Sequence, residues 1–413
     1  MPQRSGTPGR KHLSRALGRA AARFAVLVLA AALGSGGPAW ARRQKSVFHG
    51  LPIEPSSALR PGATAEPITL SPIWTFDGFA APLAGDPAAL GAGLVASDRA
   101  GRLAALDPGG PGPTWSVELD GPLSVGPMAA DGVILQATAA GELVALDARD
   151  GRTLWRVALG GAPVAPPALA AGSVLLATDA PELIALRPED GRILARLPLP
   201  GRPVAPEIAG EMAVVGTDHG MVLALDVPTL RVRWRRYLRR AVTAPPLVHD
   251  KRIYVAVADR SLRCLRLKSG RPLWRQRTGS ITGARLLVRD DLLYVQCYDN
   301  DIYVLKPGSG HLMGRVRLDH RLILDGGVTN DHLFVAPFTE GTVLGLAFPY
   351  LGMAGRFRLE AQGEWFTTRP VIVSGDRLAV GYGRDAGRIL FLSVEAGPPP
   401  AKPDDKPGAP PVQ

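Results

Sequence analysis

The sequence predicts an all-β chain that folds as an eight-bladed β-propeller, and three observations support this fold class. First, a leucine that ends a short apolar phrase recurs at intervals of 39 to 41 residues, and once at 46. Second, each interval holds about four short strands and no helical pattern. Third, an isolated strand precedes the first complete repeat. The recurring leucines are Leu106, Leu146, Leu186, Leu225, Leu265, Leu305, Leu346 and Leu392.

Residues 1–41 are predicted to be a cleaved signal peptide. Six basic residues and no acidic residue accompany an apolar run at 24–33, and Ala39-Trp40-Ala41 provides an A-x-A cleavage pattern. A membrane span needs roughly 20 apolar residues, so an uncleaved anchor is the weaker interpretation. We therefore expect an exported, periplasmic protein. No cysteine lies near the cleavage pattern, so lipid attachment is not expected there.

Two proline-containing segments are expected to flank the repeats. Residues 42–72 show little periodicity and are predicted to be a linker. Residues 397–413 are rich in proline and polar residues, so we expect a disordered tail. The propeller is predicted to span residues 73–396. The linker prolines are Pro52, Pro55, Pro61, Pro67 and Pro72.

Each repeat unit consists of short apolar runs joined by tight turns. GVILQAT and GSVLLAT are each followed by a turn and a second run, GELVAL or PELIAL. A turn such as DARDG then leads into a strand that contains tryptophan. No unit holds ten residues with helical periodicity, which excludes helical repeat arrays. Runs that are apolar on both faces are expected where sheets stack face to face around an axis, as propeller blades do.

The two ends of the repeat region predict how the ring closes. The strand at Trp74 lies 41 residues before Trp115, yet no partner strands precede it. After Leu392 the expected outer strand is missing, and the chain enters the proline-rich tail. We predict that the N-terminal strand completes the last blade, because pairing the first and last segments removes the open edges of an unclosed array.

The repeat phrase resembles that of the quinoprotein-like eight-bladed propellers, which carry PQQ-like repeats. Ala145, Asp147, Gly151 and Trp155 match the pattern A-x-D-x-x-x-G-x-x-x-W. The resemblance implies that the tryptophan docks against the neighbouring blade. Further matches are Ala105, Asp107 and Trp115 in one unit, and Ala224, Asp226 and Trp234 in another.

These fixed positions also have a physical reason that does not depend on the resemblance. A buried indole supplies a large contact area, glycine allows positive φ, and aspartate caps a turn through its side chain. The residues predicted to build the repeat are Trp74, Trp115, Trp155, Trp234, Trp274, Ala145, Asp147 and Gly151.

Two groups within this superfamily suggest different functions. In length, export and simple architecture the chain looks like the BamB-type outer-membrane assembly propellers, which act as scaffolds beside the machinery that inserts β-barrels. It departs from them because it lacks a lipobox cysteine. The pyrroloquinoline-quinone dehydrogenases imply adjacent cysteines over the cofactor and a calcium site with an Asp base. This chain has no Cys-Cys pair and no C-x-x-C-H haem motif, so we expect no cofactor.

Charge is distributed unevenly along the chain. The net charge is +11, but residues 73–230 carry −9 and residues 231–320 carry +13. Arginines directly follow the tryptophan position, or its equivalent, on six predicted outer strands. Basic residues on an outer strand could protect its edge from pairing with other chains; alternatively, they form a rim that meets an acidic domain or anionic lipid headgroups. This series is Arg156, Arg196, Arg235, Arg275, Arg315 and Arg356, with Arg277, Arg317 and Arg358 two residues further on.

The candidate partner-binding rim is centred on the basic units. It includes RVRWRRYLRR at 231–240, a pattern that would suggest nucleic acid in a cytosolic protein. The predicted outer strand explains its aromatic residues, and the signal peptide directs the chain out of the cytosol, so no nucleic-acid partner is expected. The candidate rim residues are Arg231, Arg233, Arg235, Arg236, Arg239, Arg240, Arg275, Arg277, Arg315 and Arg317.

Acidic residues are predicted at the turns between the second and third strands of the units. One interpretation is a cation-binding mouth lined by carboxylates. The other is that aspartate begins tight turns by accepting hydrogen bonds from nearby backbone, and this interpretation is preferred. The series is Asp98, Asp179, Asp218, Asp259, Asp299, Asp301, Glu340 and Asp385.

Other motifs indicate no site. GAGLVA at 91–96 matches G-x-G-x-x-A but opens a strand, so a dinucleotide site is not expected. The seven histidines include no pair at metal spacing, and no nucleophile can be matched with a base. Cys264 and Cys297 fall at different points of the repeat, which favours free thiols over the disulfide that export would allow.

The sequence therefore predicts a non-enzymatic, exported propeller scaffold that mediates protein–protein interaction in the cell envelope. From the resemblance, the expected partner is the β-barrel assembly machinery, with peripheral contact to an anionic membrane surface and a monomeric state as further expectations. The alternatives are a PQQ-dependent oxidoreductase or quinone-binding sensor using the axial mouth, and an envelope module for a small molecule or polysaccharide. No catalytic, cofactor-binding or metal-binding residue is predicted.

Overall fold

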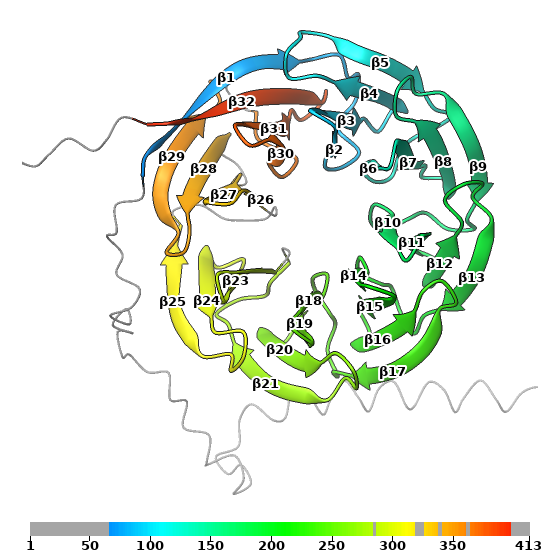
Figure 1. Ribbon diagram of the computed structural model, residues 1–413, viewed down its shortest axis with the longest axis vertical. Helices are drawn as coiled ribbons and strands as arrows, with labels where there is room; N and C mark the ends of the chain where they lie inside the picture. Colours follow the sequence, from blue (N-terminus) through cyan, green and yellow to red (C-terminus); the bar gives the residue numbers. More distant parts are fainter. Residues whose placement is uncertain (1–65, 284–285, 319–325, 338–340, 361–363, 398–413) are drawn as a thin grey trace, which may run out of the picture. The chain divides into compact units, whose positions relative to one another are not determined.

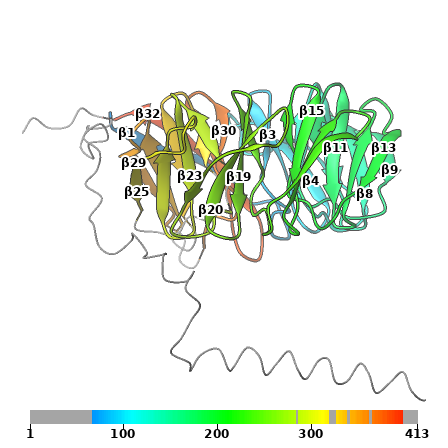
Figure 2. The same ribbon diagram turned by 90° about the horizontal axis from the view of Figure 1, so that it is seen from below.

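Four-stranded sheets arranged in a ring make up the computed structural model, which describes residues 66–283, 286–318, 326–337, 341–360 and 364–397. These residues form 32 strands and no helix, and the strands make eight sheets. Figure 1 shows the sheets around a central axis, and Figure 2 shows them edge on. The predicted eight-bladed β-propeller is confirmed. In the described part of the chain, no helix is long and apolar enough to cross a membrane.

Each blade has four antiparallel strands, named A to D from the axis outward. Blade 1 contains β2 (Ala88–Leu90), β3 (Gly93–Ser97), β4 (Arg102–Leu106) and β5 (Pro113–Glu118). Blade 2 contains β6 (Met128–Ala130), β7 (Val133–Ala137), β8 (Glu142–Asp147) and β9 (Thr153–Ala158). Blade 3 contains β10 (Ala168–Ala170), β11 (Ser173–Thr178), β12 (Glu182–Leu186) and β13 (Ile193–Pro198). Blade 4 contains β14 (Glu207–Ala209), β15 (Met212–Gly216), β16 (Met221–Asp226) and β17 (Arg231–Tyr237).

The remaining blades follow the same order, except that the last takes its D strand from the start of the chain. Blade 5 contains β18 (Leu247–His249), β19 (Arg252–Val257), β20 (Ser261–Arg266) and β21 (Pro272–Arg277). Blade 6 contains β22 (Leu287–Arg289), β23 (Leu292–Gln296), β24 (Asp301–Leu305) and β25 (Leu312–Arg317). Blade 7 contains β26 (Gly327–Val328), β27 (His332–Val335), β28 (Thr342–Ala347) and β29 (Gly352–Arg358). Blade 8 contains β30 (Val371–Ser374), β31 (Arg377–Tyr382), β32 (Arg388–Ala396) and β1 (Ile68–Phe76).

Strands B and C form the buried middle of each blade. In blade 3, every residue of β11 and every residue of β12 after Glu182 is buried. These strands are apolar on both faces because each face packs against a neighbouring blade. Strand D alternates instead, so that Trp155 and Val157 of β9 are half-buried while Arg156 and Ala158 are exposed. The outer strands therefore present every second side chain to solvent.

β1 completes the last blade, as the sequence predicts. It pairs antiparallel with β32 along its whole length, and Trp74 stacks on Phe391 with ring centroids 4.8 Å apart. Just beyond the paired strands, the Gly397 amide donates a hydrogen bond to the Pro67 carbonyl at 2.6 Å. Figure 1 shows β1 outside β32, with the blue and red ends of the described chain in one sheet.

The sheet begins before residue 73, where the sequence places the start of the propeller. β1 starts at Ile68, so residues 68–72 belong to blade 8 rather than to the predicted linker. Prolines suggest a linker here, but proline is compatible with an outermost strand because one side of its backbone needs no partner. The pairing register shifts between Pro72 and Trp74. The predicted signal peptide, linker residues 42–65 and the tail from residue 398 lie outside the described residues.

A second contact ties the last blade to the first near the axis. Arg369, which precedes β30, places its Nε 3.2 Å from Oδ2 of Asp86, which precedes β2. The backbone amide of Arg369 also donates to Asp86 Oδ1 at 2.9 Å. Blade 8 is thus joined to its neighbour at the inner side of the ring as well as through its own outer strand.

The five tryptophans named for the repeat dock against the following blade. Each indole Nε1 donates a hydrogen bond of 2.8 to 3.1 Å to a backbone carbonyl of the next C–D turn. Four of the rings also cover a glycine with positive φ; a Cβ at Gly270 would lie 2.5 Å from Trp234 Cε3. The donor and acceptor residues are Trp74 and Pro108, Trp115 and Ala148, Trp155 and Pro188, Trp234 and Leu267, and Trp274 and Pro307.

Three outer strands lack the tryptophan, in blades 3, 6 and 7, and two of the resulting interfaces share a different packing. Blades 3 and 6 have Ala195 and Gly314 at the tryptophan position. In the next blade, the turn glycine is replaced by Leu230 or Leu351, both with positive φ and both almost fully buried. Positive φ is uncommon for leucine. The large side chain therefore comes from the turn of one blade instead of the outer strand of the other, and the interface stays filled.

The two cysteines lie in the core between blades 5 and 6. Cys264 and Cys297 belong to one cluster of buried side chains with Tyr254 and Tyr303. Both thiols are free, as the sequence favours. Burial raises the pKa of each thiol to about 12, so they are protonated packing groups at neutral pH.

Candidate functional site

The arginines that follow the tryptophan position are exposed on the outer strands. Burial alternates along each strand D, and these arginines occupy the exposed positions. Figure 1 shows that the strands concerned form the outer edge of the ring. The series is Arg156, Arg196, Arg235, Arg275, Arg315 and Arg356, and the exposed positions two residues further on are Arg277, Arg317 and Arg358. We call these nine residues, with Arg231 and Arg233, the basic rim.

In blades 2 and 3 the rim arginines are neutralised. Arg156 Nη1 lies 2.7 Å from Asp120 Oδ2 and 3.7 Å from Glu142 Oε2. Arg196 Nη1 lies 2.6 Å from Glu182 Oε2. Glu142 and Glu182 occupy the same repeat position, the first residue of strand C, which pairs with the end of strand D. An acidic residue at this position therefore cancels the charge of the rim above it.

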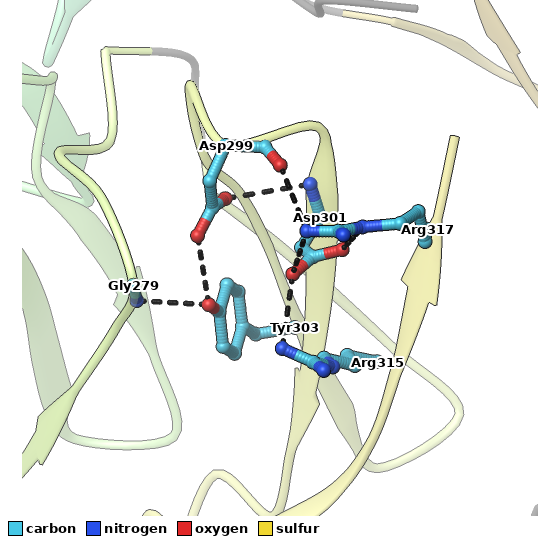
Figure 3. Close-up of polar contacts among 6 residues, drawn as sticks. All are labelled: Gly279, Asp299, Asp301, Tyr303, Arg315 and Arg317. Atoms are coloured by element: carbon cyan, nitrogen blue, oxygen red, sulfur yellow. Dashed lines mark hydrogen bonds and ion pairs between the residues drawn. The ribbon is translucent and has the colours of Figure 1, made fainter. Parts of the chain in front are cut away.

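In blade 6 one carboxylate holds two rim arginines (Figure 3). Asp301, whose side chain is only 1% exposed, lies 3.2 Å from Arg315 Nη1 and 2.9 Å from Arg317 Nε. Asp301 raises the pKa of Arg317 through hydrogen bonding. The two arginine side chains remain largely exposed, at 52% and 66%. Two cations share one buried anion, so this part of the rim keeps a net positive charge.

Asp299 and Tyr303 complete the polar cluster of Figure 3. The Tyr303 hydroxyl donates to Asp299 Oδ2 at 2.9 Å and accepts from the Gly279 amide at 2.8 Å. The Asp301 amide faces Asp299 Oδ1 at 3.4 Å. Burial raises the pKa of Tyr303 to about 12. Asp299 therefore organises the B–C turn of blade 6 and joins it to the preceding connection at Gly279.

Blade 5 uses Asp259 in a similar way. Its carboxylate accepts hydrogen bonds from Ser261, from Arg263 Nη2 at 2.6 Å and from Arg275 Nη2 at 2.8 Å. Burial opposes ionisation of Asp259, but the hydrogen bonds from Ser261 and Arg263 outweigh it and lower its pKa. Arg275 is therefore oriented while remaining about half exposed.

Four rim arginines have no ion pair within the described part of the chain: Arg235, Arg277, Arg356 and Arg358. The reason lies in the register of the repeat. The first residue of strand C is Met221 in blade 4, Ser261 in blade 5 and Thr342 in blade 7, where blades 2, 3 and 6 have an acidic residue. Each of blades 4, 5 and 7 therefore carries at least one rim arginine without an ion pair, whereas the rim arginines of blades 2 and 3 are compensated.

The segment 231–240 divides into three parts. Arg231 and Arg233 both bind Asp226, and hydrogen bonding, first from Arg233, lowers the Asp226 pKa. Arg236 differs from the other predicted rim residues because it is half-buried, with Nε donating to the Gly270 carbonyl at 3.0 Å. Arg239 and Arg240, two further predicted rim residues, follow the C-terminal end of β17 and line a hollow of about 580 Å³. The residues around it include Tyr237, Arg239, Arg240, Asp218 and His219.

Several acidic residues of the B–C turns have local structural roles, because their carboxylates accept hydrogen bonds from nearby backbone amides. Asp98 is fully buried and accepts hydrogen bonds from the backbone amides of Ala80, Ala100 and Gly101. Asp179 accepts from the Ala162 amide at 2.9 Å. Glu340 lies outside the described residues. Among the residues that are described, no group of three or more His, Cys, Asp or Glu could hold a metal ion.

The described residues do not fit the quinone-dependent site that the alternative function requires. That site implies adjacent cysteines, whereas Cys264 and Cys297 lie in different blades and are buried at 0% and 1% exposure. Both thiols belong to the core cluster between blades 5 and 6, and no carboxylate cluster for calcium accompanies them within the described ranges.

Arg356 and Arg358 are functional candidates that the predicted rim left out, although both belong to the arginine series. The prediction centred on the basic segment 231–320, and these residues lie in a segment with little net charge. The signal that identifies them is local: Thr342 stands opposite Arg358 where other blades place an acid. Pairing register, rather than segment charge, reveals which rim arginines are free.

These features define an eight-bladed propeller with PQQ-like repeats and a one-sided basic rim. The family described as "Outer membrane protein assembly factor BamB" matches residues 66–209, 139–245 and 198–321, and the chain belongs to this family. A comparison with curated proteins gives no significant match.

Three solved structures illustrate how widely the fold occurs. BamB from Moraxella catarrhalis aligns with a TM-score of 0.65 and 19% identity, covering 78% of this chain and 99% of that one. The computationally designed Ika8 protein aligns with a TM-score of 0.67 and 14% identity over 78% and 99% of the chains. Quinohemoprotein alcohol dehydrogenase from Comamonas testosteroni aligns with a TM-score of 0.64 and 12% identity over 78% and 76%. At these identities the likeness concerns the fold alone.

Proposed function

We propose that this protein is a non-enzymatic, exported scaffold that binds a protein partner in the cell envelope through the basic rim of blades 4 to 7. The observation that carries the proposal is the set of unpaired rim arginines, Arg235, Arg277, Arg356 and Arg358. If the arginines served only to keep outer strands from pairing with other chains, free charge would be expected on every outer strand. In blades 2 and 3, however, the rim arginines are neutralised by ion pairs. Membership of an outer-membrane assembly family supports the β-barrel assembly machinery as the partner.

The partner surface is expected to be acidic. Exposed arginines attract carboxylates over a range set by screening, about 10 Å at 0.1 M salt, and they steer association more than they add affinity. The outer strand also exposes backbone groups along one side, to which a partner can add a strand. Tyr237, 61% exposed at the end of β17, offers a large aromatic contact beside the charges.

Site-specific crosslinking in cells tests the proposal. A photo-reactive residue at Tyr237 or Arg277 should capture a subunit of the β-barrel assembly machinery. The same residue at Leu154, an exposed position on β9 in the neutralised part of the rim, should capture much less. Equal capture at all three positions, or capture of other proteins only, contradicts the proposal.

A charge-reversal variant gives an independent test. Arg235→Glu, Arg277→Glu and Arg356→Glu together should reduce crosslinking by roughly tenfold, because unpaired charges set the encounter rate. Arg99→Glu, Arg152→Glu and Arg192→Glu change the net charge equally at exposed positions outside the rim and serve as the control. A rim variant that is captured as well as the control removes the rim from the interface.

A further inference from the structure

We infer that a groove across blades 4 to 6 binds an extended acidic peptide segment that carries apolar side chains. The groove lies on the face formed by the A–B and C–D turns, has a volume of about 960 Å³, and is lined by Lys251, Arg266, Lys268, Leu273 and Trp274 among others. The inference does not rest on the rim proposal, because Lys251, Arg266 and Lys268 lie outside the basic rim. The one rim residue in the lining, Arg233, is paired with Asp226.

The charge of this groove comes from a departure from the repeat. In blades 1 and 2 the residue after the recurring leucine is an aspartate that caps the C–D turn: Asp107 accepts from the Gly109 amide at 2.7 Å and Asp147 from the Arg149 amide at 2.9 Å. In blade 5 this position is Arg266, and in blade 6 it is Lys306. An arginine cannot accept the capping hydrogen bond, so a favourable local contact is given up and positive charge is added.

The key cations of the groove are available to a ligand. Lys251, at the tip of the A–B turn, and Arg266 and Lys268, in the C–D turn, are exposed and have no ion pair with any described residue. The two turns are held together because the Leu267 amide donates to the Lys251 carbonyl at 2.9 Å. The backbone segments that carry these three cations are therefore joined to each other, while nearby Arg252 is already engaged by Asp250.

Apolar side chains stand directly beside these cations. The pairing of β20 with β21 shifts register between Cys264 and Leu265, and the unpaired residue opposite this shift is Leu273. Leu273 is consequently 40% exposed although it precedes the half-buried Trp274. A ligand that combines carboxylates with an apolar side chain is complementary to this surface.

The groove continues into a second hollow, which indicates an extended ligand. The second hollow has a volume of about 770 Å³ and shares Asp250, Arg252, Gly308 and Ser309 with the first. Its lining includes Asp290, Asp291 and Lys306. Asp290 pairs with Arg289 at 3.3 Å, whereas Asp291 has no ion pair with a described residue, so the positive surface of the first hollow gives way to a mixed surface with a free carboxylate. A peptide with acidic residues at one end and a basic residue at the other matches this gradient, whereas a uniformly anionic membrane does not.

Fluorescence anisotropy of the purified chain with a labelled peptide, Glu-Glu-Leu-Glu-Glu-Leu-Lys-Lys, tests the inference. We expect saturable binding that weakens with salt, and weaker binding of the charge-reversed peptide Lys-Lys-Leu-Lys-Lys-Leu-Glu-Glu. The variant Lys251→Ala, Arg266→Asp, Lys268→Ala should lose roughly tenfold in affinity, because unpaired charges that contact the ligand are removed. Arg152→Asp and Arg192→Asp together make the same charge change at exposed positions without an ion pair to a described residue, on the same face outside the groove, and should bind as the wild type does.

Several outcomes would overturn the inference. Equal binding of both peptides, or equal loss in both variants, would show a general charge effect. Competition by inorganic phosphate or phosphatidylglycerol vesicles for this groove, without binding of the acidic peptide, would assign it to a phosphate-bearing ligand instead. Because every substituted side chain is exposed, urea unfolding of each variant should match the wild type, so loss of binding can be distinguished from loss of fold.

Discussion

At the scale of single residues, the repeat depends on glycines whose neighbours leave no room for a side chain. Gly270 has φ of +63° and lies under the Trp234 ring, whereas Gly210 has φ of +61° with nothing within 4 Å of an added Cβ. The two positions share the same backbone requirement and differ in packing. They therefore separate the contribution of backbone conformation from that of the tryptophan contact.

Gly270→Ala should destabilise the protein more than Gly210→Ala. Forcing alanine into the left-handed region costs about 1 kcal/mol at either position, and displacing the Trp234 ring adds about 1–3 kcal/mol. Urea denaturation followed by circular dichroism measures both values. If the two variants lose equal stability, the tryptophan does not hold the turn of the next blade.

Residue-level chemistry also sets which parts of the rim could be predicted. The exposed side of each outer strand follows from the alternation that begins at tryptophan, so the orientation of Arg235 and Arg277 was predictable. The sequence does not reveal which arginines are free, because Arg156 pairs with Asp120 in the connection between β5 and β6, and Arg317 pairs with Asp301 across the sheet. Those pairs depend on strand register, which hydrophobic pattern alone does not specify.

At the scale of strands and blades, the interface between blades 5 and 6 contains buried thiol and phenol groups that can ionise only at high pH. Cys264, Cys297 and Tyr303 share one apolar cluster. Burial raises the pKa of each to about 12, against ordinary values of 9.0 for the thiols and 10.0 for the phenol. In the unfolded chain these groups release protons at lower pH than they do in the folded protein.

Stability should therefore fall as the pH rises above 9. Below the ordinary thiol pKa of 9.0 the thiols are protonated in both the folded and the unfolded protein, so their full contribution to the free energy of unfolding is present. That contribution is lost as the pH rises towards the folded pKa of about 12, because the unfolded chain releases these protons first. The first pH unit should cost about 1 kcal/mol for each thiol. Urea unfolding across this range measures the slope.

Two substitutions identify the groups responsible. Cys264→Ala with Cys297→Ala should flatten the alkaline decline, although the small cavities lower stability at every pH. Tyr237→Phe, which changes an exposed tyrosine outside this core, should follow the wild type. An unchanged slope in the cysteine variant would place the alkaline transition elsewhere in the molecule.

The blade interfaces also show why part of the fold could not be predicted from the sequence. The tryptophan spacing predicts the outer strands and the number of blades. Ala195 and Gly314 interrupt that pattern, and nothing in their own segments reveals what fills the space. The answer lies in the next unit, where Leu230 and Leu351 adopt the positive φ that glycine normally takes. Such an exchange is visible only when two blades face each other.

At the scale of the whole molecule, ring closure depends on a strand from the beginning of the chain. β1 starts at Ile68, next to the end of β32, because the Gly397 amide contacts the Pro67 carbonyl at 2.6 Å. The two ends are therefore close enough to be joined by a short turn. This geometry allows the chain to be circularly permuted while the pairing of β1 with β32 in blade 8 is preserved.

A circular permutant tests whether closure depends on pairing or on chain order. Joining Gly397 to Pro67 through a glycine-rich turn and opening the chain between Phe76 and Asp77 keeps every strand, so near-native stability is expected. A variant that starts at Asp77 lacks β1 and should aggregate or lose its cooperative transition, because the edge of β32 is exposed. Thermal unfolding and gel filtration compare the two. A stable, monomeric truncation would show that blade 8 does not need its outer strand.

The pairing of β1 with β32 also has a consequence for biosynthesis. Ser71 and Ser393 touch although 322 positions separate them, so the earliest strand to leave the ribosome finds its partner only after nearly the whole chain has followed. Contacts between such distant segments slow folding and leave intermediates prone to aggregation. Nascent chains should therefore require chaperone protection until synthesis ends, and a premature stop codon anywhere before β32 should yield insoluble product.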